Sequence, residues 1–256
     1  MTEKEYREAE GVNKSTLWEM RKSPAHYKYL LDHPAEDTTA LRFGRALHAA
    51  ILTPTLYKRD FVVAPEVDKR TKAGREEYAA WKASLLPEAE EITAEEAQTI
   101  AEMVKAFRRD KDAMRLLKGT RRELPIFWND KKIGLKCKCR VDAIGKEAIV
   151  DLKTTSDITT FDRDANAYGY HLQAAHYLRG VEAKTGRRPE WYFIAIEKKP
   201  PYGIKIIKAT PGFIDYGDYI RDALLEKVKD CETRGEWPSY GIGEIAEPRW
   251  ANWEVN

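Results

Sequence analysis

Hydrophobic residues recur at helical spacing through the first 120 residues of the chain. We expect helices in two short segments after Val12 and over residues 40–52, 71–85 and 93–117. The two short segments divide at Pro24, because proline is favoured in the first turn of a new helix. Thr93 and Glu96 have the spacing of a capping box, which marks the start of the last of these helices. The apolar run over residues 61–63 predicts a short strand.

The period of the pattern changes to two residues in the second half of the chain. Apolar residues from Ile133 to Val141 alternate with polar ones, which is typical of a half-buried strand with one basic face. Further strands are expected over residues 124–128, 148–152, 191–196 and 203–208, and helices over 165–184 and 211–234. Elements in this order predict an α/β fold with a mixed central sheet.

No internal repeat, low-complexity stretch or linker divides the chain, so we expect a single domain over residues 1–256. Within it we distinguish a mainly helical N-terminal region (1–120), an α/β core (121–235) and an aromatic C-terminal tail (236–256). The tail is too aromatic to be left in solvent, and we expect it to pack on the core. Its large aromatic residues are Trp237, Tyr240, Trp250 and Trp253.

Composition narrows the class of protein. Of the 256 residues, 43% are hydrophobic, which excludes wholesale disorder, and the net charge of +2 excludes a histone-like polycation. Charged residues make up 34% of the chain, so the composition still allows basic residues to gather in a local groove. No apolar run approaches the roughly 18 residues of a membrane span, and the first ten residues have no apolar signal segment. We therefore expect a cytoplasmic protein without membrane contact.

The cysteines point to the same compartment. There are three, an odd number, which favours a reducing environment. Cys137 and Cys139 are separated by a single residue, and no fourth cysteine exists. This spacing argues against a structural zinc site or a four-cysteine iron–sulfur cluster.

The candidate chemistry lies in a predicted hairpin. Asp142 ends the basic strand, and Asp151-Leu152-Lys153 ends the next one. Strand alternation places Asp151 and Lys153 on one face, and a two- or four-residue loop around Gly145-Lys146 puts Asp142 on the same face. With the four-residue loop, Ile144 faces Ile149 and Asp142 lies opposite Asp151. Two carboxylates this close repel each other unless a cation lies between them. Oxygen ligands favour Mg²⁺ or Mn²⁺, and Lys153 would lie beside the metal, so the hairpin is compatible with metal-assisted phosphodiester hydrolysis.

The triplet alone is a weak signal. An acidic residue precedes a lysine by two positions at four places, namely Asp130, Asp151, Glu182 and Glu197. In a chain this charged most of these pairs are expected to be solvated, and the Glu197 pair also ends a strand. The copy at 151–153 differs because it follows a strand that itself ends in an acid, across a tight turn. Spacing by itself leaves a site and a solvated pair about equally plausible.

Four further residues have both a functional and a structural interpretation. Gln173 and Tyr177 lie four apart on one helix face and could contact a phosphate or a base, although such a pair is more often part of a packed helix face. His48 lies in an apolar helix, where a packed histidine is more common than a ligand, but Gly44 before it could permit close approach. Glu123, before the first strand of the core, is either a further catalytic acid or a surface residue.

Two groups of basic residues could contact DNA phosphates. Lys136, Lys138 and Arg140 share a strand face with Asp142 by alternation. The second group, in a predicted loop and helix start, consists of Arg70, Lys72 and Arg75. An ordinary solvated charge is the alternative for each.

Taken together, these motifs resemble the RecB-like branch of the PD-(D/E)xK nuclease superfamily, and most closely the RecE (exonuclease VIII) type of nuclease domain and its phage relatives. The resemblance spans nearly the whole chain. It rests on Asp142, Asp151-Leu152-Lys153, Gln173, Tyr177, Gly44, His48, Ser15-Thr16-Leu17, residues 23–27, residues 122–126, Trp237-Pro238 and Tyr240. Val141 stands where the superfamily name has a proline, as is common in this branch, and the four-cysteine cluster of some relatives is missing.

The resemblance implies a restriction-endonuclease-like core, a mixed sheet flanked by helices, with the N-terminal helices over the DNA path. It implies Mg²⁺-dependent (or Mn²⁺-dependent) degradation of double-stranded DNA from 5′ ends, which leaves 3′ single-stranded tails for recombination. Relatives form rings around DNA, so a homo-oligomeric ring is expected (a tetramer before a trimer), working with a single-strand annealing protein.

The resemblance also assigns roles to residues. The metal ligands would be His48, Asp142, Asp151 and the carbonyl of Leu152. Lys153 would position the attacking water or stabilise the transition state, while Gln173 and Tyr177 would shape the site and contact DNA.

Three alternatives remain open at this point. An endonuclease or nickase would use the same metal hairpin but would also cut circular DNA. A catalytically silent DNA-binding module would bind DNA without degrading it, and a scaffold protein would show neither property.

Overall fold

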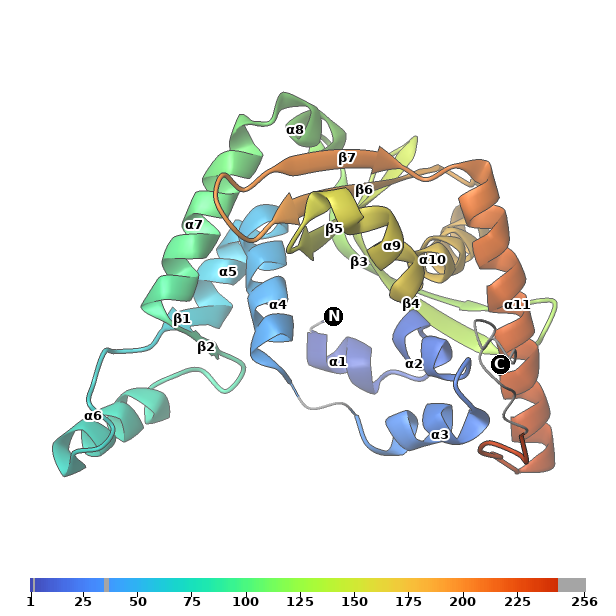
Figure 1. Cartoon of the computed structure of the whole chain (residues 1–256), viewed down its shortest axis with the longest axis horizontal. Coiled ribbons are helices and arrows are strands. Elements are labelled where there is room, and N and C mark those ends of the chain that lie inside the picture. The colour runs from blue at the N-terminus through green and yellow to red at the C-terminus, as the bar shows by residue number, and fades with distance from the viewer. Residues whose placement is uncertain (2, 35–36, 244–256) are drawn as a thin grey trace, which may run out of the picture.

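The structure, a computed structural model, describes residues 1, 3–34 and 37–243. Figure 1 shows a central sheet with helices on both sides and a small outlying helical arm. The helices of the N-terminal region are α1 (Glu3–Glu8), α2 (Lys14–Glu19), α3 (Pro24–Asp32), α4 (Thr39–Leu52), α5 (Pro54–Asp60), α6 (Lys72–Ala83), α7 (Ala94–Arg109) and α8 (Lys111–Leu117). Helices therefore make up most of the described residues before β3.

Local signals explain where these helices begin. Side chains of Asn13 and Ser23 accept hydrogen bonds from the first turns of α2 and α3, and Thr93 and Glu96 form the predicted capping box of α7. The single helix predicted over 93–117 is two helices, because the extended backbone of Asp110 ends α7 and its carboxylate caps α8. The predicted strand β1 (Phe61–Val63) pairs in parallel with an unpredicted one, β2 (Glu90–Ile92).

The central sheet is mixed, as the order of elements predicted. Its strands in spatial order are β3 (Arg121–Asn129), β4 (Lys136–Ile144), β5 (Ala148–Thr155), β6 (Glu190–Glu197) and β7 (Ile204–Lys208). β5 and β6 are parallel and the other neighbours are antiparallel. Ile144 pairs with Ile149, which is the register of the four-residue loop, one of the two loops that the sequence left open. β3 begins earlier than predicted, so Glu123 lies inside the strand.

The remaining elements follow β5 and β7. They are a 3₁₀ turn (Ile158–Thr160), α9 (Phe161–Ala167), α10 (Tyr170–Thr185) and α11 (Pro211–Arg234). The helix predicted over 165–184 is divided at Gly169, whose φ of 63° is left-handed and separates α9 from α10. α11 has the predicted bounds, from a proline in its first turn to a left-handed glycine after Arg234.

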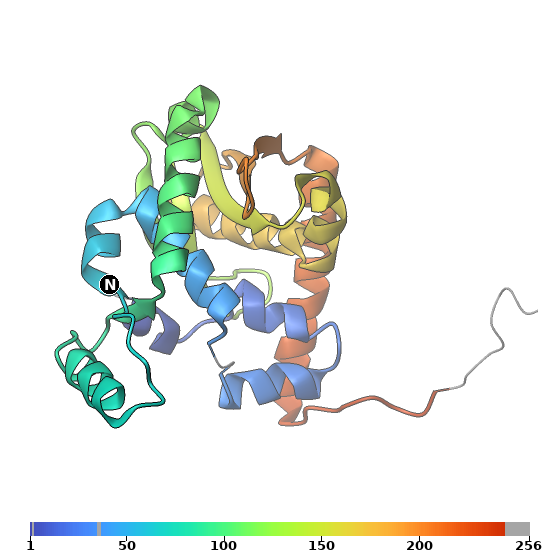
Figure 2. The ribbon, with the colours of Figure 1, turned by 60° about the vertical axis from the view of Figure 1, so that its left-hand side comes forward.

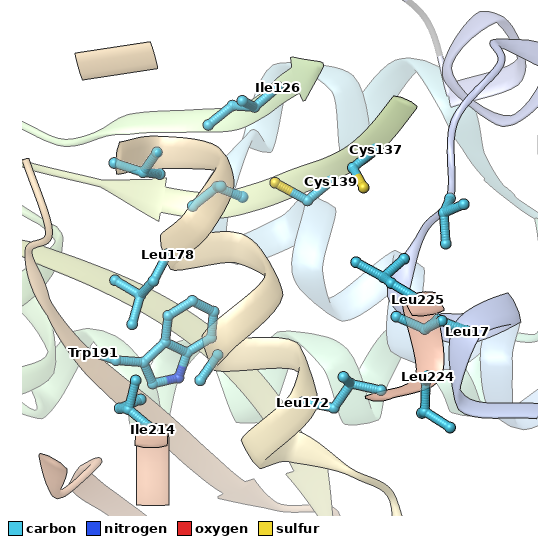
Figure 3. Close-up of a cluster of buried hydrophobic side chains, with 14 of the residues drawn as sticks. Leu17, Ile126, Cys137, Cys139, Leu172, Leu178, Trp191, Ile214, Leu224 and Leu225 are labelled. Atoms are coloured by element: carbon cyan, nitrogen blue, oxygen red, sulfur yellow. The ribbon is translucent and has the colours of Figure 1, made fainter. Parts of the chain in front are cut away.

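Hydrophobic side chains fill both sides of the sheet. Figure 3 shows the larger cluster, in which α10 and α11 pack on the sheet around Trp191, Leu225 and Cys139. A second cluster lies between the other side of the sheet and the helices α4, α7 and α8. Val141 belongs to the first cluster and Ala143 to the second, so the predicted alternation of β4 shifts at Asp142.

The first residues of the C-terminal tail contact α3, whereas packing of the whole tail on the core stays a prediction. The ring of Trp237 stacks on Tyr27 with centroids 5.5 Å apart, and the carbonyl of Pro238 accepts a hydrogen bond from the Ala25 N–H at 3.1 Å. Trp250 and Trp253 lie outside the described residues. All three cysteines are buried free thiols. Within the described ranges, no helix combines the length and the apolar character that a membrane span requires.

Candidate metal centre

The hairpin of β4 and β5 opens where its acidic residues begin. The two strands pair only at Ala143–Val150 and Ile144–Ile149. Beyond this point a side chain replaces the backbone as hydrogen-bond acceptor. Asp142 Oδ2 accepts a hydrogen bond from the Leu152 N–H at 2.9 Å. The side chain of one strand thus bonds to the backbone of the other, and this holds Asp142 beside the Asp151-Leu152-Lys153 segment.

Three side chains from three elements converge on the opening. Ligand atoms of His48 (α4), Glu123 (β3) and Asp142 (β4) all lie within 4.8 Å of one another, and His48 Nδ1 is 3.4 Å from Asp142 Oδ2. Glu123 stands in register with Asp142, between the paired positions Arg122–Ala143 and Leu124–Val141. Its φ of 48° is unusual for a residue with a side chain, and such strain often marks functional positions.

A second layer surrounds Asp151, which is only 1% exposed. The Lys153 ammonium forms an ion pair with Asp151 Oδ2, and Gln173 Nε2 donates a hydrogen bond to Oδ1 at 2.5 Å. This confirms that Asp151 and Lys153 share a face of β5. It also gives Gln173 a defined contact, since α10 brings its amide to a site carboxylate rather than to solvent.

The acids of the site are held in an environment that disfavours their charge. Burial raises the pKa of Asp151 to about 6, and the charge of Asp142 adds to the effect while Lys153 opposes it. Burial likewise raises the pKa of Asp142, against the charge of Lys153 and the Leu152 N–H. Burial opposes the charge on Lys153, but the two carboxylates outweigh it and raise its pKa. Burial and Lys153 together lower the pKa of His48 to about 4, so its imidazole is neutral at pH 7.

These properties fit a divalent cation. A neutral imidazole nitrogen and carboxylate oxygens form a donor set that Mg²⁺ and especially Mn²⁺ accept. A bound cation would offset the burial cost that raises the pKa values of the carboxyl groups. Of the ligands that the resemblance implied, His48 and Asp142 lie in the converging group, and Glu123, expected as a catalytic acid, joins them there. Asp151 lies next to this group, and its carboxylate forms an ion pair with Lys153 and accepts a hydrogen bond from Gln173.

Comparison with known families identifies the fold. Residues 13–247 match the model of a family described as a PDDEXK-like domain of unknown function (DUF3799). The chain belongs to this family. Membership confirms the predicted resemblance to the PD-(D/E)xK superfamily, and with the restriction-endonuclease-like sheet it supports a nuclease.

One solved structure has a similar overall fold. The chain is similar to a "Putative exonuclease" from Eubacterium rectale, with a TM-score of 0.63 and 17% identity over 95% of this chain and 96% of that one. An alkaline exonuclease (LHK-Exo) from Laribacter hongkongensis aligns at 17% identity and a TM-score of 0.29, over 75% of this chain and 97% of that one. No curated protein matches the chain.

The basic face of β4 in this PDDEXK-like domain is largely occupied by its own N-terminus. Lys138 is 4% exposed and donates hydrogen bonds to backbone carbonyls at the end of α1, among them that of Arg7 at 2.9 Å. Lys136 pairs with Glu10 at 2.6 Å. Because α1 covers this face, we withdraw Lys138 from the candidate DNA contacts, while Lys136 remains exposed at the surface.

Arg140 lies beside the candidate metal centre, and a DNA contact by it stays a prediction. Its Nε lies 2.8 Å from Glu123 Oε2, so it orients a residue of the metal centre. The sequence did not predict this link, because the expected strand began at Leu124 and excluded Glu123. Had the first strand of the core been extended to Arg121, Glu123 would have fallen opposite Asp142 and next to Arg140.

Tyr177 and the basic residues of the second group complete the predicted set. Tyr177 lies edge-on to Trp191 with ring centroids 5.8 Å apart, and burial raises its pKa well above the usual value. The second basic group lies on α6 and the loop before it, in the arm that extends from the body in Figures 1 and 2. Its members have local partners, in the pairs Arg70–Asp68, Lys72–Glu76 and Arg75 with the Arg70 carbonyl. A DNA contact by Tyr177 or by this arm stays a prediction.

Proposed function

We propose that this protein is a metal-dependent exonuclease that degrades double-stranded DNA, with 5′ to 3′ polarity, and leaves 3′ single-stranded tails. The observation that carries the proposal is the convergence of His48, Glu123 and Asp142 within 4.8 Å, beside the Asp151–Lys153 ion pair. Family membership supports hydrolysis of phosphodiesters as the reaction class. The polarity and the recombination role come from the resemblance of the sequence to RecE-type nuclease domains.

In this proposal, the position of each residue determines whether it binds the metal, acts on the phosphate or orients another residue. His48, Glu123, Asp142 and Asp151 would hold Mg²⁺ or Mn²⁺, together with the Leu152 carbonyl, as the resemblance to RecE-type nuclease domains implies. A bound divalent cation would supply positive charge to the phosphate and would favour deprotonation of a water. Lys153 donates hydrogen bonds from its ammonium group to the attacking water or to a phosphate oxygen, and so stabilises charge that builds on phosphorus.

Hydrolysis then forms a bond between the water oxygen and phosphorus and breaks the bond between phosphorus and one deoxyribose oxygen. The water loses a proton and the departing oxygen gains one. Gln173 acts through Asp151, because its amide fixes the orientation of that carboxylate at 2.5 Å. Arg140 acts in the same way on Glu123. Both are positioning residues, whereas Lys153 is placed as a catalytic residue.

A homo-oligomeric ring, a tetramer before a trimer, and a single-strand annealing partner belong to the same proposal. They follow from the resemblance and are consistent with an enzyme that stays on a DNA end. Sedimentation analysis of the purified protein with and without linear duplex measures the subunit number directly.

A labelled-end assay tests the function. Linear duplex carrying a label at either the 5′ or the 3′ end is incubated with the protein, with and without Mg²⁺, beside a covalently closed circle. We expect Mg²⁺-dependent release of the 5′ label first, with the circle intact. Early loss of the 3′ label reverses the polarity, cutting of the circle identifies an endonuclease or nickase, and binding without any cleavage identifies a silent DNA-binding module.

A further inference from the structure

Lys14 places a second ammonium group near the candidate metal centre. It opens α2, and its Nζ donates a hydrogen bond to the Tyr168 backbone carbonyl at 2.5 Å. In the described part of the chain no carboxylate forms an ion pair with it. Lys14 has no role among the residues predicted from the sequence.

Lys14 and Lys153 share one aromatic ring. The Nζ of Lys153 lies 4.8 Å from the centre of the Tyr170 ring, and the Nζ of Lys14 lies 6.0 Å from it. Burial lowers the pKa of Lys14 to about 8, and the charge of Lys153 lowers it further while Asp151 opposes the shift. Two cations therefore lie around one ring, and the carboxylates nearby are already engaged with the metal centre.

The position of Lys14 is fixed by close packing. Trp18, four residues further on, lies 5.8 Å from the Lys14 Nζ, and a Cβ at Gly169 would fall 2.8 Å from the Trp18 ring. Only glycine, with its left-handed φ of 63°, allows the turn before α10 to meet α2 this closely. Arg21 lies over the same indole at 4.4 Å, so a cation, an aromatic ring and a second cation follow one another along this face.

We propose that Lys14 binds a phosphate of the DNA strand next to the phosphate that is hydrolysed, so that Lys14 and Lys153 hold two neighbouring phosphates. The inference rests on the proposed function, since it takes a polynucleotide as the substrate of the metal centre. A phosphate between or beside two partly dehydrated cations offsets their mutual repulsion. Lys14 is then a positioning residue for the strand, whereas Lys153 acts at the reacting phosphate.

Salt dependence of binding tests the contact directly. Binding of a fluorescent linear duplex is measured by anisotropy at several salt concentrations in a D151N background, with and without K14Q. Loss of one phosphate contact lowers the slope of log K against log salt by about 0.9, which weakens binding about eight-fold at 0.1 M salt. We expect this change for K14Q, and we expect K14R, which keeps the charge, to restore the slope.

Lys22 provides the matched control. It lies just beyond α2 and is 42% exposed, but it has a carboxylate partner, Glu19, at 2.6 Å. K22Q should leave both the slope and the affinity within a factor of about two of the parent protein, as expected for an exposed ion pair. If K14Q fails to fold, as judged by circular dichroism, K14M keeps the alkyl chain against Trp18 and the same criterion applies.

Kinetics separate this inference from the proposed function. In the active protein, K14Q should raise KM about eight-fold and lower kcat by no more than about three-fold, because Lys14 does not touch the reacting phosphate. An unchanged salt slope for K14Q, in a protein that cuts DNA, overturns the inference and leaves the function intact. A protein that never cuts DNA but loses slope with K14Q refutes the function and retains Lys14 as a phosphate contact.

Discussion

Two buried clusters in this domain contain the same kinds of groups but behave in opposite ways. One is the candidate metal centre with His48, Asp142, Asp151 and Lys153. The other lies at the far end of β3, where Asp130 meets His176 of α10 and Arg221 of α11. Each combines carboxylate, imidazole and a cation, and the sequence even repeats an Asp-x-Lys triplet at both, Asp130 to Lys132 and Asp151 to Lys153.

The second cluster satisfies its own charges. The Arg221 guanidinium is 1% exposed and forms an ion pair with Asp130, whose Oδ1 also accepts two backbone N–H groups at 3.1 Å. His176 Nε2 lies 3.2 Å from the carbonyls of Val12 and Lys138, and its Nδ1 faces Arg221. Burial opposes the charge of Asp130, but Arg221 prevails and lowers its pKa.

The metal centre leaves charge uncompensated. Burial raises the pKa values of Asp142 and Asp151, and one ammonium group, that of Lys153, serves both. A closed network stabilises the fold, because each buried group has its partner. A cluster with unpaired buried charge destabilises the free protein, and a bound cation would restore that stability. This is how a ligand site differs from a structural cluster of equal composition.

The largest expected effect is the loss of DNA hydrolysis when residues of the candidate metal centre are replaced. Asp142→Ala, Asp151→Ala and Lys153→Ala should each reduce DNA hydrolysis by about 10³-fold or more, since each removes a ligand or a donor at the reacting phosphate. DNA binding, measured by anisotropy, should largely survive. Full activity in any one variant removes that residue from the mechanism.

The other triplet supplies the control for this comparison. Lys132 has the same spacing from an aspartate but is 65% exposed and pairs with Asp222 at 3.0 Å. K132Q should retain hydrolysis within a factor of about two and change stability by less than about 1 kcal/mol, as for other surface ion pairs.

The second prediction concerns stability. Arg221→Met leaves Asp130 buried without its cation, and breaking such a pair costs about 3–5 kcal/mol in the free energy of unfolding. Urea denaturation measures the loss, and the protein that remains folded should still cut DNA. A loss below about 1 kcal/mol would show that Asp130 finds another partner and that the cluster is not a closed network.

The positions of these clusters were only partly predictable. The two-residue period predicted the strands of the sheet, but the turn left two registers open, of which the structure has the Ile144–Ile149 pairing. The alternation rule then failed within one strand, because β4 shifts its faces at Asp142 and α1 covers the face that carries Lys138. Neither event has a local sequence signal, since both depend on where distant elements pack.

The site residues, too, were predictable only where the prediction needed a single strand. Asp151 and Lys153 were predictable because they lie two apart on one strand. Glu123 was placed outside its strand, and its φ of 48° and its contact with Arg140 depend on pairing between β3 and β4. Asp130 and Asp151 could not be told apart by spacing, since the difference is supplied by Arg221, 91 residues away along the chain.

The third prediction uses the metal to probe the open cluster. Mg²⁺ or Mn²⁺ at about 100 times its dissociation constant should stabilise the protein by about 2.7 kcal/mol, because only the folded state assembles the ligands. Thermal unfolding with increasing metal, against EDTA, measures the shift. Asp142→Asn should abolish the shift, whereas Arg221→Met should retain it. A metal-independent melting temperature for the unchanged protein would contradict a cation site.

The smallest effect tests the division of roles inside the metal centre. Gln173→Ala removes the amide that fixes Asp151, and loss of such a supporting hydrogen bond typically costs about 10- to 100-fold in activity or metal affinity. The residual activity should rise with metal concentration, since the ligands themselves remain. Gln173→Glu should be more harmful than Gln173→Ala, because it sets a further carboxylate against Asp151, an acid whose pKa burial already raises. A loss in Gln173→Ala as complete as that in Asp151→Ala would place Gln173 among the catalytic groups rather than behind them.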